Sequence, residues 1–369
     1  MSEWKSSMTG IVDGHVHMGG MAEEKAMLMI CEATGIERMA LVSIQDPKAG
    51  TGLAGSLYMK ARHPKVFYVF AGLNHAAKLF GERVTTPRLA EQVEAFVQMG
   101  CDGLKMVEGK PTSRKQMNVP VTDPYFAPYW ARVEELGLPI VWHVNDPEEF
   151  WEPAKLPVWA RDLNWGYGPG DVQKEQLYAE VDAVLGRYPR LRVIFAHFYF
   201  LSADLPRARR FLDEHPGVCF DLAPGIEMLY NLSRDPDASR EFFVEYADRI
   251  VFGTDLSSRQ TVEQGRFRAG IVYRWLESED TYRIPAGTDF LLGAPEDGLI
   301  RGLSLPAEVL TRIYHGNFAR LAGPEPRALN VGRVVEECER LGAIAEALSG
   351  TPAAETEAAR VAKLLARGG

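Results

Sequence analysis

The stretch Ile11-Val12-Asp13-Gly14-His15-Val16-His17 begins the first regular segment of this 369-residue chain. A short apolar run that ends in alternating polar residues is typical of a strand buried at one end. Residues two apart in a strand point to the same side, so His15 and His17 share one face. Two neutral imidazoles on one face can bind a single divalent ion. The stretch therefore predicts a metal site, although a His-x-His pair alone is equally compatible with two unrelated histidines.

Seven further apolar segments are predicted as strands, and stretches with helical spacing of apolar residues separate them. They cover residues 39–44, 66–73, 103–107, 139–143, 192–197, 218–222 and 250–254. Strands that alternate with helices of ten or more residues pair in parallel through right-handed crossovers. Eight such units predict a (β/α)8 TIM barrel, an α/β fold, with a doubly wound sheet as the second choice.

Three segments depart from this regular alternation. Residues 146–171 are rich in Pro, Trp, Gly and Tyr and directly follow a predicted strand, so we expect a lid or pocket wall there. Residues 257–307 form a long segment after the eighth strand, with helical character over 262–277. Residues 324–369 are rich in Ala, Glu and Arg and predict a helical appendage to a barrel of residues 1–323.

Composition narrows the class of protein. The chain is 46% hydrophobic and 25% charged, as in ordinary globular proteins, with a formal net charge of -9. Because no run of Lys and Arg is present, we expect a small-molecule substrate and neither nucleic acid nor a membrane surface as partner. Residues 1–9 lack a signal core and no stretch has the roughly 18 apolar residues of a membrane span, so a cytoplasmic protein is expected. A homo-oligomer is left open.

Five side chains suited to metal binding or acid-base chemistry fall where predicted strands end. They are His15, His17, His143, His197 and Asp255. In an α/β barrel the chemistry lies at the carboxyl ends of the strands, so these side chains would share one rim. Each alone is equally compatible with an ordinary buried polar group, but together they predict a functional centre. The four cysteines are scattered without Cys-x-x-Cys spacing, which argues against a thiolate zinc site.

Motifs at these positions resemble the amidohydrolase superfamily, within it the amidohydrolase-related (amidohydrolase 2) branch that includes aminocarboxymuconate-semialdehyde decarboxylase and sugar lactonases. The matching pieces are Asp13-Gly14-His15-Val16-His17, Trp142-His143, Ala196-His197, Gly253-Thr254-Asp255 and Gly316-Asn317-Phe318-Ala319-Arg320-Leu321. The resemblance implies the same barrel and a catalytic polar role for His197. It also implies one divalent metal held by His15, His17, His143 and Asp255.

The chemistry of these side chains agrees with that implication. Three imidazoles and a carboxylate leave room for one water and suit zinc, and they would also accept manganese, iron or cobalt. An ion held this way activates water as a nucleophile and polarises a substrate oxygen. Asp255 can take a proton from that water, and His197 can hydrogen-bond the substrate oxygen or shuttle a proton.

Two features depart from the branch. Its decarboxylases follow the histidine of the sixth strand with glycines, whereas Phe198-Tyr199-Phe200 stands here, so this pocket wall has a different shape. Binuclear relatives use a carbamylated lysine at the end of the fourth strand, where Lys105 lies. For Lys105 we favour a charge partner inside the barrel or a contact to a substrate carboxylate. Glu108 is a weaker ligand candidate, expected to be a solvated carboxylate.

Further residues near the rim are candidates for contact with the substrate. They are Lys105, Trp142, Asn145, His75 and Tyr167; the alternative for Lys105 is a carbamate that bridges two metals, and for the other four it is ordinary packing or solvation. Trp142 and Tyr167, with Trp151 and Trp165, would form an aromatic pocket wall. Asp221, near the end of the seventh strand, would orient a ligand imidazole or pair with a neighbouring cation.

For the reaction, we expect hydrolysis of a small cyclic ester, amide or related carbonyl compound. The alternative is a lyase, a non-oxidative decarboxylase or hydratase that uses the same metal site on a small carboxylic acid. A decarboxylase also needs a cation for the departing carboxylate, and only Lys105, Arg114 and Arg259 lie near the rim. A barrel that keeps the ligands for structure alone is disfavoured, because structural zinc sites are closed and usually rich in cysteine.

Overall fold

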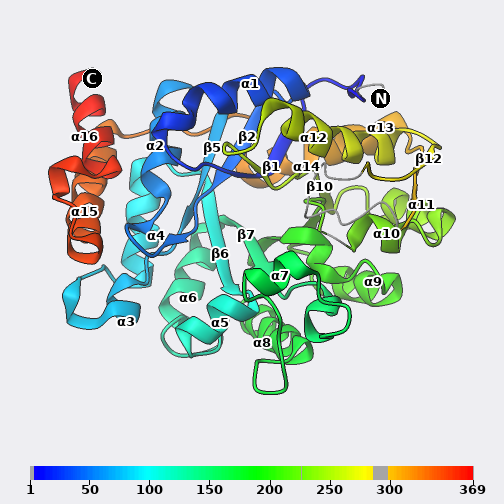
Figure 1. Ribbon diagram of the computed structural model, residues 1–369, viewed down its shortest axis with the longest axis horizontal. Helices are drawn as coiled ribbons and strands as arrows, with labels where there is room; N and C mark the ends of the chain where they lie inside the picture. Colours follow the sequence, from blue (N-terminus) through cyan, green and yellow to red (C-terminus); the bar gives the residue numbers. More distant parts are fainter. Residues whose placement is uncertain (1–3, 226, 286–297, 369) are drawn as a thin grey trace.

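The computed structural model describes residues 4–225, 227–285 and 298–368, and helices surround a central parallel sheet (Figure 1). Part of the segment 257–307 and the first three residues lie outside the described residues. The strands of the sheet are β1 (Val12–His17), β2 (Arg38–Val42), β5 (Phe67–Gly72), β6 (Gly103–Gly109), β7 (Pro139–Val144), β8 (Arg192–Phe195), β9 (Val218–Asp221), β10 (Ile250–Val251) and β11 (Leu256–Ser257). Their order is β10-β9-β8-β7-β6-β5-β2-β1-β11.

The sheet closes on itself because β10 and β11 belong to one short segment, residues 250–257. β10 pairs with β9 and β11 pairs with β1, both in parallel. Between these pairings, the Gly14 amide donates to the Phe252 carbonyl at 2.9 Å, and the Asp255 amide donates to the His15 carbonyl at 2.9 Å. The predicted eighth strand therefore pairs with β9 through β10 and with β1 through β11, which closes the ring and confirms the predicted (β/α)8 barrel.

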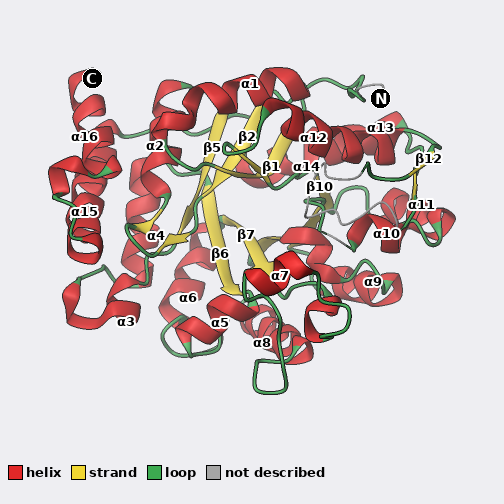
Figure 2. Cartoon of the chain, viewed as in Figure 1, coloured by secondary structure: helices red, strands yellow, loops and turns green. Residues whose placement is uncertain are grey.

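Helices cover the outer face of the sheet (Figure 2). Those described are α1 (Glu24–Thr34), α2 (Leu53–Arg62), α3 (Ala76–Phe80), α4 (Leu89–Met99), α5 (Pro111–Met117), α6 (Ala127–Leu136), α7 (Val158–Asp162), α8 (Lys174–Arg187), α9 (Leu205–Glu214), α10 (Met228–Leu232), α11 (Pro236–Glu245), α12 (Val262–Glu277), α13 (Ala307–Thr311), α14 (Asn317–Ala322), α15 (Val331–Ser349) and α16 (Glu357–Gly368). Gly35, Gly100 and Gly137 end α1, α4 and α6 in the left-handed conformation that glycine adopts without strain.

Alternation along the strands sorts side chains between two hydrophobic cores. Val141 and Cys219 belong to the cluster inside the barrel, together with Phe318 of α14, while Trp142 belongs to the cluster under the helices. His143 and Asp221 each follow an inner residue by two positions, so they share its side. The polar residues of the rim therefore lie above an apolar floor.

Segments added to the barrel form small units of their own. The hairpin of β3 (Gln45–Asp46) and β4 (Gly50–Thr51) follows β2, and β12 (Thr281–Tyr282) pairs with β13 (Ile300–Arg301). The predicted lid contains a short helical turn over Glu148–Trp151 and α7. Its hydrophobic side chains, most of them aromatic, form a separate cluster: Phe150, Ala160 and Tyr167, with Trp151, Leu156, Trp159 and Trp165.

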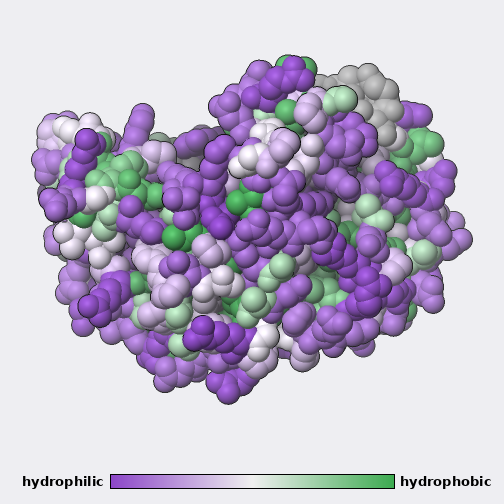
Figure 3. Space-filling model, turned by 90° about the horizontal axis from the view of Figure 1, so that it is seen from below, coloured by the Kyte–Doolittle hydropathy of each residue, from purple (hydrophilic) through white to green (hydrophobic). Residues whose placement is uncertain are grey.

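The C-terminal residues form the predicted helical extension, α15 and α16, which lies beside α2 and α4 (Figure 1). The face of the molecule seen from below is mainly hydrophilic, with hydrophobic side chains in small patches (Figure 3). No helix in the described part of the chain combines the length and apolarity needed to cross a lipid bilayer.

Candidate metal centre

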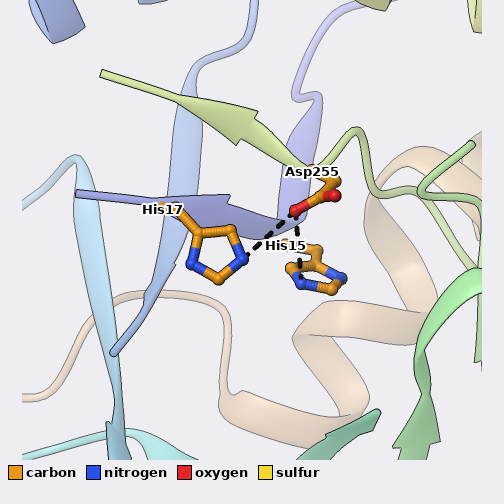
Figure 4. A group of neighbouring side chains, drawn as sticks. All are labelled: His15, His17 and Asp255. Carbon is orange, nitrogen blue, oxygen red and sulfur yellow. Dashed lines mark ion pairs between the residues drawn. The ribbon is translucent and has the colours of Figure 1, made fainter. Parts of the chain in front are cut away.

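Three side chains meet at the carboxyl end of β1. His15 and His17 face the same side, and Asp255 faces them from the segment that closes the barrel (Figure 4). Asp255 Oδ1 lies 3.1 Å from His17 Nε2 and 3.7 Å from His15 Nε2. One ligand atom from each of the three lies within 4.8 Å of the other two. Two imidazoles and a carboxylate at this spacing fit one divalent ion and leave room for further ligands.

Asp221 orients His15. Its Oδ2 lies 2.9 Å from His15 Nδ1, and its Oδ1 accepts hydrogen bonds from the backbone amides of His197 at 2.8 Å and Ala223 at 3.1 Å. With Nδ1 donating to this carboxylate, His15 Nε2 presents a lone pair to the centre, as a metal ligand requires. Burial, with the nearby charge of Lys105, holds the pKa of His15 well below its usual value. The ring is therefore neutral, which is the form that binds metal.

Asp13 joins the two backbone segments that carry the ligands. Its carboxylate accepts from the backbone amide of His15 at 3.0 Å, from the amide of Thr254 at 3.1 Å and from the Thr254 hydroxyl. Burial raises the pKa of Asp13 to about 7, partly offset by these hydrogen bonds. Asp255 itself has φ of 57°, a left-handed conformation that is uncommon for aspartate. This local geometry turns its carboxylate toward the histidines.

Lys105 places a cation beside the ligand atoms. Its side chain is buried, and its Nζ lies 3.0 Å from His15 Nε2. Burial lowers the pKa of Lys105 to about 8, while the carboxylates of Asp221 and Asp255 counteract this shift. Lys105 thus lies beside the proposed ligand atoms, and both roles favoured for it stay predictions.

His143 lies next to the centre but is engaged elsewhere. Its Nε2 lies 3.0 Å from the Asn145 carbonyl oxygen and 3.3 Å from Asp146 Oδ1, and its ring centroid is 4.7 Å from that of His197. Burial, followed by the charge of Lys110, lowers the pKa of His143 to about 4. Within the described residues, the spacing that groups His15, His17 and Asp255 does not include His143. Its role as fourth ligand stays a prediction.

Asp146 connects His143 to the lid, and the sequence reasoning did not single it out. Lys110 Nζ donates to its Oδ1 at 2.6 Å, and the Tyr167 hydroxyl donates to its Oδ2 at 2.5 Å. Although burial opposes ionisation, Lys110 and His143 hold the pKa of the Asp146 carboxyl well below its usual range. Lys110 also lies 4.2 Å from the ring centroid of Trp165. The one sequence signal for a role of Asp146 is its position three residues after His143.

His197 belongs to a left-handed turn rather than to the end of a strand. β8 ends at Phe195, and residues 197–200 all have φ between 51° and 58°. Glycine takes this conformation without strain, whereas for each other residue it costs about 1–2 kcal/mol of conformational energy. Here Phe198 packs on Phe243, and Tyr199 packs on Phe195 with ring centroids 4.2 Å apart. Aromatic packing therefore holds a turn that glycine would adopt without strain.

Within that turn, His197 points its ring into the centre. Its Nδ1 lies 3.0 Å from the Ala223 carbonyl oxygen, and its ring centroid is 5.4 Å from that of His15. Because the carbonyl accepts, Nδ1 carries the proton and Nε2 can accept one. Burial, then the neighbouring His143, lowers the pKa of His197 to about 3.

Two expectations need correction. Trp142 does not line a pocket: it is buried under the helices, 4.9 Å from the ring of Trp130 and 5.5 Å from that of Phe195. Strand alternation is the reason, since its neighbour His143 faces inward. Glu108 is not solvated, because it is buried and its Oε1 lies 2.8 Å from His75 Nε2.

The other candidates lie near the rim with partners of their own. His75 uses both ring nitrogens, with the second 2.8 Å from the Tyr125 hydroxyl, so a substrate contact would have to replace one partner. Asn145 is fully buried with φ of 69°, and its side-chain amide donates to the Lys174 carbonyl at 3.3 Å. The sequence did not identify Arg268 as a residue of the centre, because it is one of several charged residues in the segment that forms α12. It is fully buried, and its guanidinium lies 3.8 Å from Asp255 Oδ2.

Two cavities differ in their relation to the centre. One of about 200 Å³ lies among the loops after β2, β5 and β6, and His75 and Lys110 line it together with Gln45. A larger one of about 400 Å³ lies between α1 and α12 and includes none of the metal-centre residues. The smaller cavity is not lined by His15, His17 or Asp255 either, but it lies at the carboxyl rim, where its lining residue Lys110 contacts Asp146 beside His143.

Comparisons with known proteins show the family of this chain and support its fold. Residues 87–323, well over half of the chain, match the Amidohydrolase family. A structure titled amidohydrolase II is 13% identical with a TM-score of 0.51, covering 85% of this chain and 99% of the other. 5-carboxyvanillate decarboxylase from Sphingomonas paucimobilis is also 13% identical with a TM-score of 0.51, and the match covers 85% of this chain and 99% of the other. 2,6-dihydroxybenzoate decarboxylase is 16% identical with a TM-score of 0.50, and the match covers 85% of this chain and 98% of the other.

These structural likenesses support the barrel fold, since their sequence identities are low. No curated protein matches the sequence significantly. The family match itself includes Lys105, His143, His197 and Asp255. The chain belongs to the amidohydrolase family.

Proposed function

We propose that this protein is a metal-dependent lyase that removes the carboxyl group from a small carboxylic acid. One observation carries the proposal: the buried Lys105 Nζ lies 3.0 Å from His15 Nε2, beside the proposed ligand atoms. A decarboxylase needs a cation there to hold the substrate carboxylate. From the sequence alone the orientation of Lys105 was open, and this was one of the reasons for favouring hydrolysis, together with the water-activating set and the absence of glycines after His197.

The other two cations considered for this role pair with carboxylates of their own. Arg114 pairs with Glu180, and the exposed Arg259 lies 3.8 Å from Glu23. Lys105 is therefore the residue we assign to the substrate carboxylate. Aromatic carboxylic acids are the first class to test, because two solved barrels of similar fold are decarboxylases of such acids.

The metal would be one divalent ion, with zinc as the first choice and manganese, iron or cobalt as alternatives. His15, His17 and Asp255 would hold it, with His143 as the predicted fourth ligand. When bound, the ion supplies Lewis-acid polarisation of a substrate oxygen.

The protein's own groups would bind the substrate and move the proton. In decarboxylation the bond between carbon and carboxylate breaks, carbon dioxide leaves, and the carbon that keeps the electron pair takes a proton. We assign the relay of that proton to His197, whose Nδ1 is held by the Ala223 carbonyl so that Nε2 faces the centre. The lid residues Tyr167 and Trp165 contact Asp146 and Lys110, and we assign them to excluding water above His143.

Hydrolysis of a lactone or cyclic amide is the second candidate. The observation that favours it is the position of the Asp255 carboxylate within 3.7 Å of both histidines, from which it could accept a proton from an attacking water. Hydrolysis does not require a carboxylate on the substrate, so Lys105 would then serve only as a charge partner.

Product analysis distinguishes the two candidates. The purified protein, loaded with zinc or manganese, would be incubated with a panel of hydroxybenzoates, muconate-type acids, lactones and cyclic amides. Release of carbon dioxide that is lost in His197→Asn and in Lys105→Met supports the lyase. Ring opening of a lactone or amide without carbon dioxide would overturn the lyase in favour of hydrolysis, and absence of bound metal by elemental analysis would overturn both.

A further inference from the structure

The C-terminal extension, residues 324–368, is an addition to the family's barrel. The family match ends at residue 323, before α15 begins. The 5-carboxyvanillate decarboxylase structure is covered over 99% of its length by 85% of this chain. The extension packs against the barrel: α15 and α16 contact each other as well as α2 and α4. Its contacts therefore indicate what it adds to this protein.

The extension contacts the loops that follow the first strands of the barrel, on the side of the metal centre. Ile344 and Leu348 of α15 pack against Ala76, Phe80 and Val84, which follow β5. α15 also lies against β4, in the hairpin after β2. The turn after β1 is contacted by Glu357, at the start of α16. One added element thus supports three neighbouring loops of the catalytic face.

The carboxylate of Glu357 lies in a cradle formed by two glycines. A Cβ atom on Gly20 would lie only 2.4 Å from Glu357 Oε2, and one on Gly55 would lie 3.1 Å from Oε1. A side chain at Gly20 would displace the carboxylate, and one at Gly55 would crowd it. Burial raises the pKa of the Glu357 carboxyl, and an interaction with the backbone amide of Met21 partly offsets the rise. Glu357 therefore contacts the backbone of this turn directly.

The same turn is hydrogen-bonded to the backbone that carries the proposed ligands. The Gly19 amide donates to Ser258 Oγ at 2.8 Å, and the Ser258 amide donates to the His17 carbonyl at 3.0 Å. The Ser258 hydroxyl in turn donates to Glu23 at 2.6 Å. Ser258 follows Asp255 by three residues, so a shift of the turn would alter the spacing of His17 and Asp255.

We propose that Glu357 is a positioning residue for the metal centre. By filling the cradle between Gly20 and Gly55, it holds the turn after β1 and thereby keeps His17 at its spacing from Asp255. The C-terminal extension then sets how tightly the centre binds a divalent ion. This inference rests on the proposed metal centre.

The test uses full-length variants and zinc as the probe. Glu357→Ala removes the carboxylate, Glu357→Gln keeps its shape and acceptor oxygen, and Glu346→Ala removes an exposed carboxylate from the same extension. Val361→Ala weakens the buried side of α16 without touching the turn. For each variant, zinc affinity is measured by competition with a chromophoric chelator. Urea unfolding and hydrogen exchange of residues 18–23 are measured on the metal-free protein.

The expected result is a loss of zinc affinity of about ten-fold in Glu357→Ala, with faster exchange in residues 18–23. Glu357→Gln, Glu346→Ala and Val361→Ala should stay within about two-fold of the wild-type affinity. Wild-type affinity in Glu357→Ala, or an equal loss in Val361→Ala at equal loss of stability, would overturn the inference. If the wild type binds no zinc, the proposed function fails, and unchanged exchange in Glu357→Ala would then separately overturn the positioning role.

Discussion

Asp221 Oδ2 lies 2.9 Å from His15 Nδ1, across 206 residues of sequence, in a fully buried contact. Both oxygens of this carboxylate accept hydrogen bonds, one from His15 and the other from the backbone amides of His197 and Ala223. One side chain therefore sets the tautomer of a proposed metal ligand and the backbone position of a proposed catalytic residue.

This geometry predicts that Asp221→Asn weakens metal binding. An asparagine has one acceptor oxygen and one NH2 group, so in either orientation the NH2 group would face a donor, either His15 Nδ1 or the amides of His197 and Ala223. We expect about 10- to 100-fold weaker zinc affinity, as for other groups that orient ligand histidines. The exposed Asp237→Asn is the control. Equal affinity in Asp221→Asn and wild type, measured by chelator competition, would contradict the assignment.

A second prediction concerns the charge of Lys105. Lys105→Met removes a cation 3.0 Å from His15 Nε2 and leaves an apolar side chain of similar length. Two like charges repel strongly in a buried site, so the variant should bind zinc about ten-fold more tightly or better at pH 7. Its activity toward carboxylic acids should be lost. As the control, Lys363→Met at an exposed position should change neither zinc affinity nor activity. Weaker zinc binding in Lys105→Met would contradict the prediction and would mean that the lysine helps to hold the ligand side chains in place.

The left-handed turn predicts an unusual order of stabilities. Tyr199→Ala and Tyr199→Gly lose the same aromatic packing, but only glycine adopts φ of 56° without strain. Tyr199→Gly should therefore be more stable than Tyr199→Ala by about 1 kcal/mol in urea unfolding. At Phe195, with φ of -76°, the order should reverse. If the alanine variant is more stable than the glycine variant at both positions, the turn carries no backbone strain.

Glu227 predicts a pH dependence of stability. Within the described part of the chain both its carboxylate oxygens are buried without a hydrogen-bond partner, and burial raises its pKa from near 4.5 to about 7. The folded state therefore holds the proton more tightly than the unfolded state, and stability falls as pH rises from about 4.5 to about 7. Above that window the full penalty, on the order of 3 kcal/mol, is present.

Glu227→Gln removes this titration. Relative to wild type, the variant should gain stability between pH 4.5 and pH 8 by about 2–3 kcal/mol, measured as the free energy of unfolding in urea at the two pH values. The exposed Glu346→Gln is the matched control. A constant difference between Glu227→Gln and wild type across this range would mean that Glu227 titrates normally in the folded protein.

The sequence by itself determined the barrel and the facing of residues along single strands. The alternation of strands and helices predicts eight parallel units, and the spacing of His15 and His17 places both on one face, because strand geometry repeats every two residues. The same rule, applied to His143, would have placed Trp142 under the helices. Local rules of this kind need no knowledge of the rest of the chain.

Only the tertiary structure decided which distant residues meet. The contact of Asp221 with His15 and that of Glu357 with Gly20 depend on the closure of the barrel and on the docking of α16, which no local pattern encodes. The left-handed turn at His197 is a further case. Its residues are aromatic and would ordinarily avoid this conformation, so packing against Phe195 and Phe243 outweighs local preference. Long-range packing energy, summed over many contacts, decides such positions.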